Sequence, residues 1–169
     1  MKKLLAIFTV ICVMFSLCGC VFLKDMADSA GFEKPKTFEY DGLSIELTND
    51  FLRMDFVSEE YDFIIGTEEI TVLGVKVDVE DNENISDMDY AVAFRNAFID
   101  NNPTELTEIS SIPTLNYEFS DDNGKNQTAA VMFYKGTDCF WVVTFATLSN
   151  NFDELYDEIC GYAKTVKCD

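Results

Sequence analysis

Apolar and polar residues alternate along the first part of the chain after residue 37, and this pattern predicts antiparallel strands. Residues 43–48 read Leu-Ser-Ile-Glu-Leu-Thr, and an Asp-Gly turn at residues 41–42 follows Phe38 and Tyr40. A period of two is typical of a strand with one buried face. Further apolar runs predict strands at residues 51–57, 62–67 and 70–79. Gly74 interrupts the alternation of the last run, which predicts a β-bulge there.

The next segment has the signals of an amphipathic helix. Ser86 is a suitable N-cap with Asp89 three residues later, and Asn-Asn-Pro at residues 101–103 ends the helix. Its apolar residues fall on one face: Tyr90, Phe94, Ala97 and Phe98. A helix with one apolar face is expected to lie across a sheet.

The second half of the chain predicts more strands and a closing helix. The strands are expected at residues 105–109, 114–119, 128–134 and 139–147, with glycine-containing turns at residues 122–124 and 135–136. Residues 139–147 are apolar on both faces, which predicts a central strand. Residues 151–164 have helical spacing, with Asn151 as the expected cap and residues 165–168 as a last short strand.

These elements predict a single α+β domain over residues 37–169, an antiparallel β-sheet flanked by helices. The length suits one hydrophobic core, and the domain contains neither a repeat nor a second linker.

The first nineteen residues have the pattern of a secretory signal peptide. Lys2 and Lys3 precede an almost continuous apolar run over residues 4–17, which is shorter than the roughly 20 residues that a membrane span needs. The run ends at Leu17, Cys18, Gly19 and Cys20, which resemble the lipobox of bacterial lipoproteins. That resemblance implies removal of residues 1–19, recognition through Leu17, Cys18 and Gly19, and attachment of acyl chains such as palmitate at Cys20. The alternative is an ordinary signal peptide cleaved nearby, with Cys20 free or paired.

Residues 20–36 then form the lipidated end and a tether. This stretch has no clear period of two and carries Pro35 near its end, which indicates a linker. Phe22, Leu23 and Met26 could instead make a short amphipathic turn against lipid.

The charge excludes some partners. Loss of Lys2 and Lys3 with the leader leaves 10 basic residues against 31 acidic ones, a net charge of −21. Nucleic acid and anionic lipid surfaces draw their affinity from Lys and Arg, so neither is an expected electrostatic partner.

Three cysteines remain beyond Cys20, namely Cys139, Cys160 and Cys168. They allow at most one disulfide within the chain. Cys160 and Cys168 are the closest pair in sequence, and buried free thiols are the alternative.

Element order supports a second resemblance. A start of the form Tyr-x-Gly-Leu-Ser-Ile-Glu-Leu-x-x-x-Phe at residues 40–51, followed by strands, a helix, more strands and a C-terminal helix, resembles the PsbP-like and DcrB-like α/β sandwiches. The resemblance covers about residues 37–168. It implies a non-enzymatic binding or accessory role at a membrane surface. Fold analogy does not identify the ligand or the partner, because unrelated functions share one fold.

Catalytic chemistry has few candidates in this sequence. The chain has no His, so Ser-His-Asp triads, Cys-His pairs and imidazole metal sites are excluded. It also lacks a phosphate-binding Gly-rich loop and Cys-x-x-Cys spacing. A hydrolase that uses carboxylates alone is the remaining enzymatic alternative, because acidic pairs are abundant.

One acidic stretch has the composition of a calcium site. Its possible ligands are Asp78, Glu80, Asp81 and Glu83, before Asp87 and Asp89. Calcium prefers six to eight oxygens from a flexible loop. The EF-hand spacing is absent, so a solvated loop is the competing interpretation.

Exposed aromatic residues are the other candidate for binding. Tyr61, Tyr117, Tyr134 and Tyr162 could rim a surface groove or could line the edge of the core.

Together these features predict a lipoprotein of a bacterial cell membrane that faces the extracytoplasmic side. We expect it to act as a non-enzymatic binding or accessory module for an envelope protein or a small ligand. A calcium-stabilised surface protein is the alternative from another class.

Overall fold

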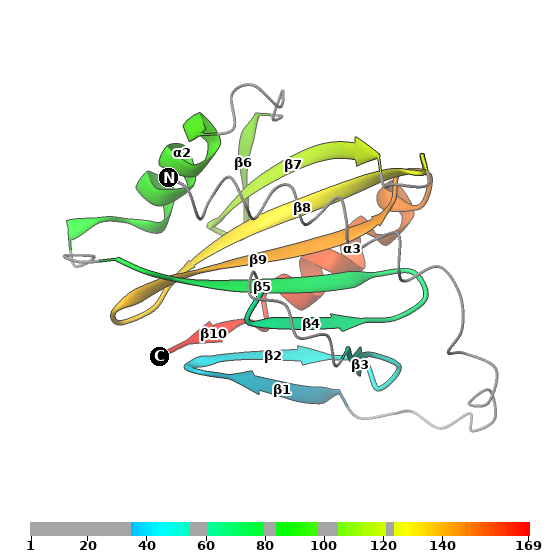
Figure 1. The fold of residues 1–169 in the computed structure, drawn as a ribbon, viewed down its shortest axis with the longest axis horizontal. Helices are drawn as coiled ribbons and strands as arrows, with labels where there is room; N and C mark the ends of the chain where they lie inside the picture. The colour runs from blue at the N-terminus through cyan, green and yellow to red at the C-terminus, as the bar shows by residue number, and fades with distance from the viewer. Residues whose placement is uncertain (1–34, 55–60, 80–83, 98–104, 121–123) are drawn as a thin grey trace.

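The computed structural model describes residues 35–54, 61–79, 84–97, 105–120 and 124–169, and within them the chain forms two antiparallel sheets (Figure 1). The larger sheet has the strand order β3-β4-β5-β9-β8-β7-β6. Its strands are β3 (Leu52–Arg53), β4 (Phe63–Gly66), β5 (Thr71–Asp78), β6 (Leu106–Ile109), β7 (Ile112–Ser120), β8 (Asn126–Lys135) and β9 (Cys139–Leu148). The smaller sheet has the order β1-β2-β10 and consists of β1 (Lys36–Tyr40), β2 (Leu43–Leu47) and β10 (Lys167–Cys168).

The two described helices cover opposite faces of the larger sheet. Helix α2 (Asp87–Ala97) contacts β6, β7 and β8, whereas α3 (Phe152–Ala163) contacts β9 and also β2 of the smaller sheet. The smaller sheet and α3 therefore lie on one face and α2 lies on the other (Figure 1). This arrangement confirms the predicted α+β sandwich of antiparallel sheet flanked by helices.

Strand β9 is the centre of the larger sheet, as its composition predicts. It is the fourth of seven strands, paired with β5 on one side and β8 on the other. Every residue from Cys139 to Thr147 is buried. Burying both faces of one strand removes much more apolar area from water than a one-sided strand does, so β9 contributes heavily to stability.

The main hydrophobic cluster lies between the two sheets and α3, and we call it the inter-sheet core. Its largest fully buried side chain is Trp141. The cluster consists of Phe38, Leu43, Ile45, Leu47, Phe51, Phe63, Ile65, Ile70, Val72, Ala130, Met132, Cys139, Trp141, Val143, Phe145, Phe152, Ile159, Tyr162 and Ala163. Since β1, β2 and α3 all contribute to it, the smaller sheet is held by apolar burial as well as by strand pairing.

The opposite face carries a second cluster under α2. Tyr90 of the helix stacks on Phe140 with ring centroids 4.4 Å apart, and Phe94 meets Phe133 edge-on at 5.1 Å. The expected placement of this helix across the sheet is confirmed. Because Tyr90 is largely buried, its pKa is raised to about 12.

The helix starts differ in how they are capped. Ser86 Oγ accepts the backbone N–H of Asp89 at 3.0 Å, and the Ser86 N–H and hydroxyl both donate to Asp89 Oδ2, so the predicted cap is present. The pKa of Asp89 is lowered by these hydrogen bonds from Ser86. At α3, Asn151 occupies the N-cap position as predicted, but its side chain makes no capping hydrogen bond.

Strand β7 begins earlier than predicted because of an unusual turn. Ile109 pairs with Ile112, so only Ser110 and Ser111 connect β6 to β7. Both serines have positive φ, 53° and 71°. Such two-residue turns usually contain Asn or Gly, and their absence explains why the sequence did not show this hairpin.

The β-bulge predicted at Gly74 is wrong. The pairing of β5 with β9 runs residue for residue through Leu73–Thr144, Gly74–Val143 and Val75–Val142. The alternation changes because the apolar residues change face at Gly74: Val72 belongs to the inter-sheet core, whereas Val75 and Val77 pack against clusters on the opposite face. The Phe63 ring occupies the place of a Gly74 side chain. A Cβ at Gly74 would lie 2.0 Å from Phe63 Cε1.

We expect Gly74→Ala to destabilise the domain by about 1–3 kcal/mol, because the new methyl group must displace the buried Phe63 ring. Gly161→Ala in α3 is the matched control. A Cβ there meets no atom within 4 Å, so this change should stabilise the domain by about 0.5–1 kcal/mol through helix propensity. Urea unfolding of both variants measures the difference. A Gly74→Ala variant as stable as the wild type would show that the ring contact is not restrictive.

Candidate functional site between the two sheets

The residues predicted for membrane attachment are not among those that the structure describes. Leu17, Cys18, Gly19 and Cys20 lie outside the described ranges, and their roles stay predictions. In the described parts of the chain, no helix has the length and apolar character needed to cross a membrane.

The predicted calcium ligands are only partly described. Glu80, Asp81 and Glu83 lie outside the described ranges, whereas Asp78 is the exposed last residue of β5. Within those ranges, no three His, Cys, Asp or Glu side chains come together as metal ligands. The calcium site therefore also stays a prediction.

The four tyrosines proposed as an aromatic rim do not share a surface. Tyr61 belongs to a small cluster with Ile64 and Leu73, and Tyr117 lies in the cluster under α2. Tyr134 and Tyr162 face the inter-sheet core on the other side of the larger sheet. Three of the four are buried and Tyr134 is half-buried, so the rim hypothesis is wrong and the core-edge interpretation holds.

The polar ends of the two inter-sheet tyrosines have protein partners. The Tyr134 hydroxyl donates to the Ala163 carbonyl oxygen at 2.9 Å. The Tyr162 hydroxyl donates to Glu158 and lies 3.1 Å from Thr48 Oγ1. Burial raises the pKa of Tyr162 to about 12, and the hydrogen bond to Glu158 acts in the same direction. Both tyrosines therefore act as structural hydrogen-bonding groups.

An aromatic stack connects the smaller sheet to the edge of the larger one. The Tyr40 ring lies on the Phe63 ring with centroids 4.2 Å apart and planes at 16°. Phe63 in turn lies 6.0 Å from Trp141. The pairing of Phe63 with Gly74 allows this arrangement, since the glycine leaves room for the ring across β5.

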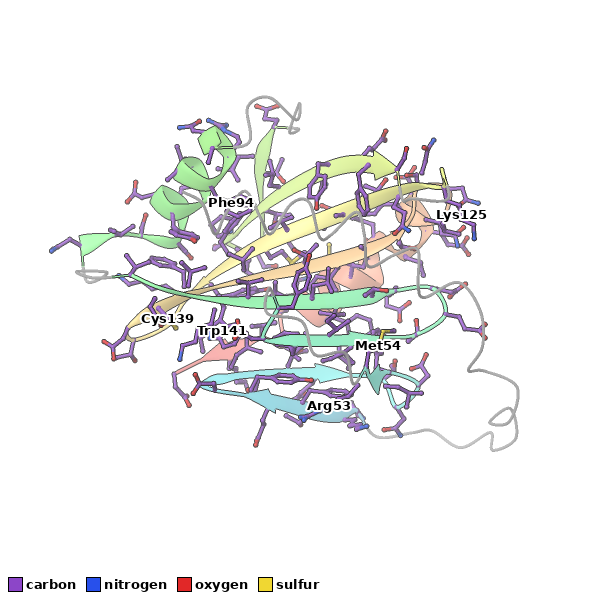
Figure 2. The ribbon with its side chains drawn as sticks, viewed as in Figure 1. Arg53, Met54, Phe94, Lys125, Cys139 and Trp141 are labelled. Carbon is purple, nitrogen blue, oxygen red and sulfur yellow. The ribbon has the colours of Figure 1, made fainter. Side chains whose placement is uncertain are left out.

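Arg53 completes the stack at its exposed end (Figure 2). Its guanidinium carbon lies 4.6 Å from the centre of the Tyr40 ring, and its Nη2 donates to the Glu39 carbonyl oxygen at 3.2 Å. Because Phe63 covers one face of Tyr40, the guanidinium covers the other. Lys36 adds a second cation 4.6 Å above Phe38. Such contacts each contribute roughly 0.5–1 kcal/mol at exposed sites.

Two buried polar atoms beside this stack have no hydrogen-bond partner among the described residues. They are the Tyr40 hydroxyl oxygen and the Trp141 Nε1. Trp141 is only 1% exposed, and its indole N–H can only donate. A buried polar group without a partner costs about 1–3 kcal/mol, so these two atoms lower the stability of the domain.

Charged groups and thiols lie at one end of the inter-sheet core. Lys76 Nζ contacts Asp41 Oδ2 at 2.6 Å, and this hydrogen bond raises the pKa of Lys76. Burial raises the pKa of the Cys139 thiol, which the Lys76 ammonium partly offsets. The pKa of Cys168 is raised to about 12, chiefly by burial and further by Cys139. Both thiols are therefore largely protonated near neutral pH, which slows any reaction that needs a thiolate.

These residues support binding more readily than catalysis. The chain has no imidazole, and the inter-sheet thiols retain their protons. What the stack offers is an exposed cation over an aromatic face, together with two buried groups that lack partners. The sequence pattern did not reveal this arrangement, because Tyr40, Arg53, Phe63 and Trp141 come from four separate strands.

Replacing Tyr40 tests whether its hydroxyl has a partner. We expect Tyr40→Phe to leave the free energy of unfolding unchanged or slightly higher, because it removes an unpaired buried hydroxyl. Tyr134→Phe is the matched control and should cost about 1 kcal/mol, since it removes the hydrogen bond to Ala163. Equal losses in the two variants by urea unfolding would mean that Tyr40 is hydrogen-bonded after all.

Comparison with known proteins identifies the fold. The sequence matches no family model and no curated protein. Among solved structures, the chain is similar to the cyanobacterial PsbP of Synechocystis sp. PCC 6803, with a TM-score of 0.52 and 11% identity over 87% of this chain and 99% of that one. The Ran-binding protein Mog1p of Saccharomyces cerevisiae gives a TM-score of 0.50 and 9% identity over 80% of this chain and 96% of that one.

A protein from Bacteroides thetaiotaomicron VPI-5482 gives a TM-score of 0.56 at 9% identity. The match covers 76% of this chain and 45% of that protein, so the chain spans less than half of its length. Identities of this size are informative about the fold alone. The chain therefore has a PsbP-like α/β sandwich, as its element order predicts.

Proposed function

We propose that the chain is a lipoprotein held in a bacterial cell membrane through Cys20, and that its domain acts as a non-enzymatic binding or accessory module on the extracytoplasmic side. The observation that carries the proposal is the Leu-Cys-Gly-Cys sequence at residues 17–20, directly after a basic start and an apolar run. A diacylated amino-terminal cysteine would anchor the domain stably, because two acyl chains suffice where one is marginal.

Several observations support a role in binding. The chain has no His, and the thiols of the inter-sheet core hold their protons. One of the proteins with a similar structure is named a Ran-binding protein, so binding is a task that this fold supports elsewhere. An envelope protein or a small ligand is the kind of partner that we propose.

The chemistry of the aromatic stack suggests what such a partner would present. Arg53 and Lys36 are exposed cations next to aromatic rings in a chain of net charge −19. A carboxylate or other acceptor oxygen on an otherwise apolar or aromatic group would complement them. The negative charge elsewhere disfavours nucleic acid.

Replacing Cys20 tests the anchor. We expect Cys20→Ala to abolish incorporation of a labelled fatty acid and to leave residues 1–19 attached, because the thiol is the acceptor of the lipid. Cys18→Ala is the matched control, since it removes a neighbouring thiol without removing the acceptor, and it should keep both label and processing. Metabolic labelling followed by intact mass measurement gives the result. Normal processing and membrane retention of Cys20→Ala would overturn the lipoprotein assignment.

Adding calcium tests the alternative function, a calcium-stabilised surface protein. The acidic stretch that begins at the exposed Asp78 is proposed to be a solvated loop, so millimolar calcium should change the melting temperature no more than magnesium at equal ionic strength. A rise of several degrees with calcium alone, reversed by a chelator, would favour the calcium-stabilised surface protein instead.

A further inference from the structure

Two cysteines far apart in sequence lie at the same end of the inter-sheet core. Cys139 is the first residue of β9 and projects to the same face as Trp141, in the inter-sheet core. Cys168 is in β10, directly opposite Leu43 of β2, and packs against that core from the smaller sheet. Residues that oppose each other in a ladder project to the same side, so Cys168 faces inward like Leu43.

Main-chain hydrogen bonds bring the two sheets together at this end. The Thr137 N–H donates to the Asp169 oxygen at 2.8 Å, and the Asp169 N–H donates to the Gly42 carbonyl oxygen at 2.9 Å. Asp169 thus joins the β8–β9 turn to the β1–β2 turn (Figure 1). Here the backbones are hydrogen-bonded neighbours, much closer than the ~10 Å between sheets packed face to face.

Gly136 gives a second measure of this proximity. A Cβ at Gly136 would lie 2.9 Å from Cys139 Sγ and 3.1 Å from the Asp169 oxygen. The Cys139 sulfur is therefore within about 6 Å of the residue that follows Cys168. A disulfide joins Cα atoms about 4.4–6.8 Å apart, and the contacts around Gly136 place the backbone that follows Cys168 beside the Cys139 side chain.

We propose that Cys139 and Cys168 are a modification site at which a disulfide links β9 to β10, formed by exchange with a low-molecular-weight disulfide or an oxidised protein dithiol. The pairing differs from the Cys160–Cys168 pair that sequence spacing suggests. Cys160 lies on α3, and the groups that act on its thiol belong to the same helix or its C-cap, namely Tyr156, Asp157 and Lys164. Cys139, Cys160 and Cys168, the cysteines of the described ranges, are free thiols in this structure.

The exchange balances in two steps. One protein thiol loses its proton and attacks the reagent disulfide, so the reagent S–S bond breaks, a mixed disulfide forms and one reagent thiolate leaves. The second protein thiol loses its proton and attacks the protein sulfur of the mixed disulfide, which releases the second reagent thiolate. Cys139 and Cys168 together give up two electrons, and the reagent takes up these electrons and both protons as two thiols.

The linkage would tie the C-terminal strand to the centre of the larger sheet. It closes a loop that contains all of α3, and closing a loop of this size restricts the unfolded chain. Reduction would leave β10 held by two residue pairs with β2 and by the Asp169 hydrogen bonds. The proposed export would bring the chain into a compartment where such oxidants occur, but the pairing does not depend on the lipid anchor.

Oxidation of the purified full-length chain tests the pairing. The reduced protein is exposed to glutathione disulfide at pH 8.5, alkylated, and digested with trypsin and a Glu-specific protease. Glu154 and Glu158 separate Cys139 from Cys160, and Lys164 and Lys167 separate Cys160 from Cys168. We expect mass spectrometry to find Cys139 linked to Cys168, and the melting temperature to rise by several degrees.

Two cysteine variants serve as matched controls, and the fluorescence of the single tryptophan gives an independent signal of oxidation. Cys160→Ser should keep the linkage and the rise in melting temperature, whereas Cys168→Ser should lose both. Trp141 lies two residues from Cys139, so its fluorescence should fall on oxidation of the Cys160→Ser variant and recover on reduction. A Cys160–Cys168 link, any other pairing of Cys168, or full reaction of Cys139, Cys160 and Cys168 with the alkylating agent would overturn the proposal. None of these outcomes depends on the lipid. A negative result would therefore overturn the disulfide proposal without affecting the proposed lipid anchor.

Discussion

The contact between the Phe63 ring and Gly74 determines how the two sheets meet. Phe63 and Gly74 are direct neighbours across β4 and β5, and the ring lies where a Gly74 side chain would project. The ring thereby becomes a flat surface on which Tyr40 stacks, and Tyr40 brings the β1–β2 hairpin with it. A larger residue at position 74 would lift the ring and disturb the whole stack. The packing of the inter-sheet core therefore depends on the absence of a side chain at Gly74.

The same contact connects the fold to the proposed function. It holds Tyr40 with one face on Phe63 and the other under the Arg53 guanidinium, which leaves a cation exposed at the end of a rigid aromatic stack. Beside the stack, the Trp141 Nε1 and the Tyr40 hydroxyl remain without partners. The exposed guanidinium over an aromatic face can recognise an acceptor group, which is the chemistry of the proposed binding role. The similarity to PsbP and Mog1p structures agrees with the fold and carries no substrate or activity.

Most of the fold could be predicted from the sequence because its signals are local. Alternation located the strands, the Ser86 capping box located α2, and apolar residues on both faces identified β9 as central. The errors arose where the determining partner is distant. Gly74 resembled a bulge because the Phe63 ring that covers it lies in another strand. The placement of Cys139 and Cys168 at one end of the inter-sheet core was missed for a similar reason, since it follows from a chain reversal through α3. The aromatic stack could not be foreseen either, because its four members come from separate strands.

Native mass spectrometry of the wild-type chain, released gently from its own membranes, is the decisive experiment for the proposed lipoprotein. We expect a chain that begins at Cys20 and carries a diacylglycerol, with additional non-covalent mass that is lost on unfolding and gives the size of the partner. A chain that retains residues 1–19 and carries no lipid would contradict the proposal.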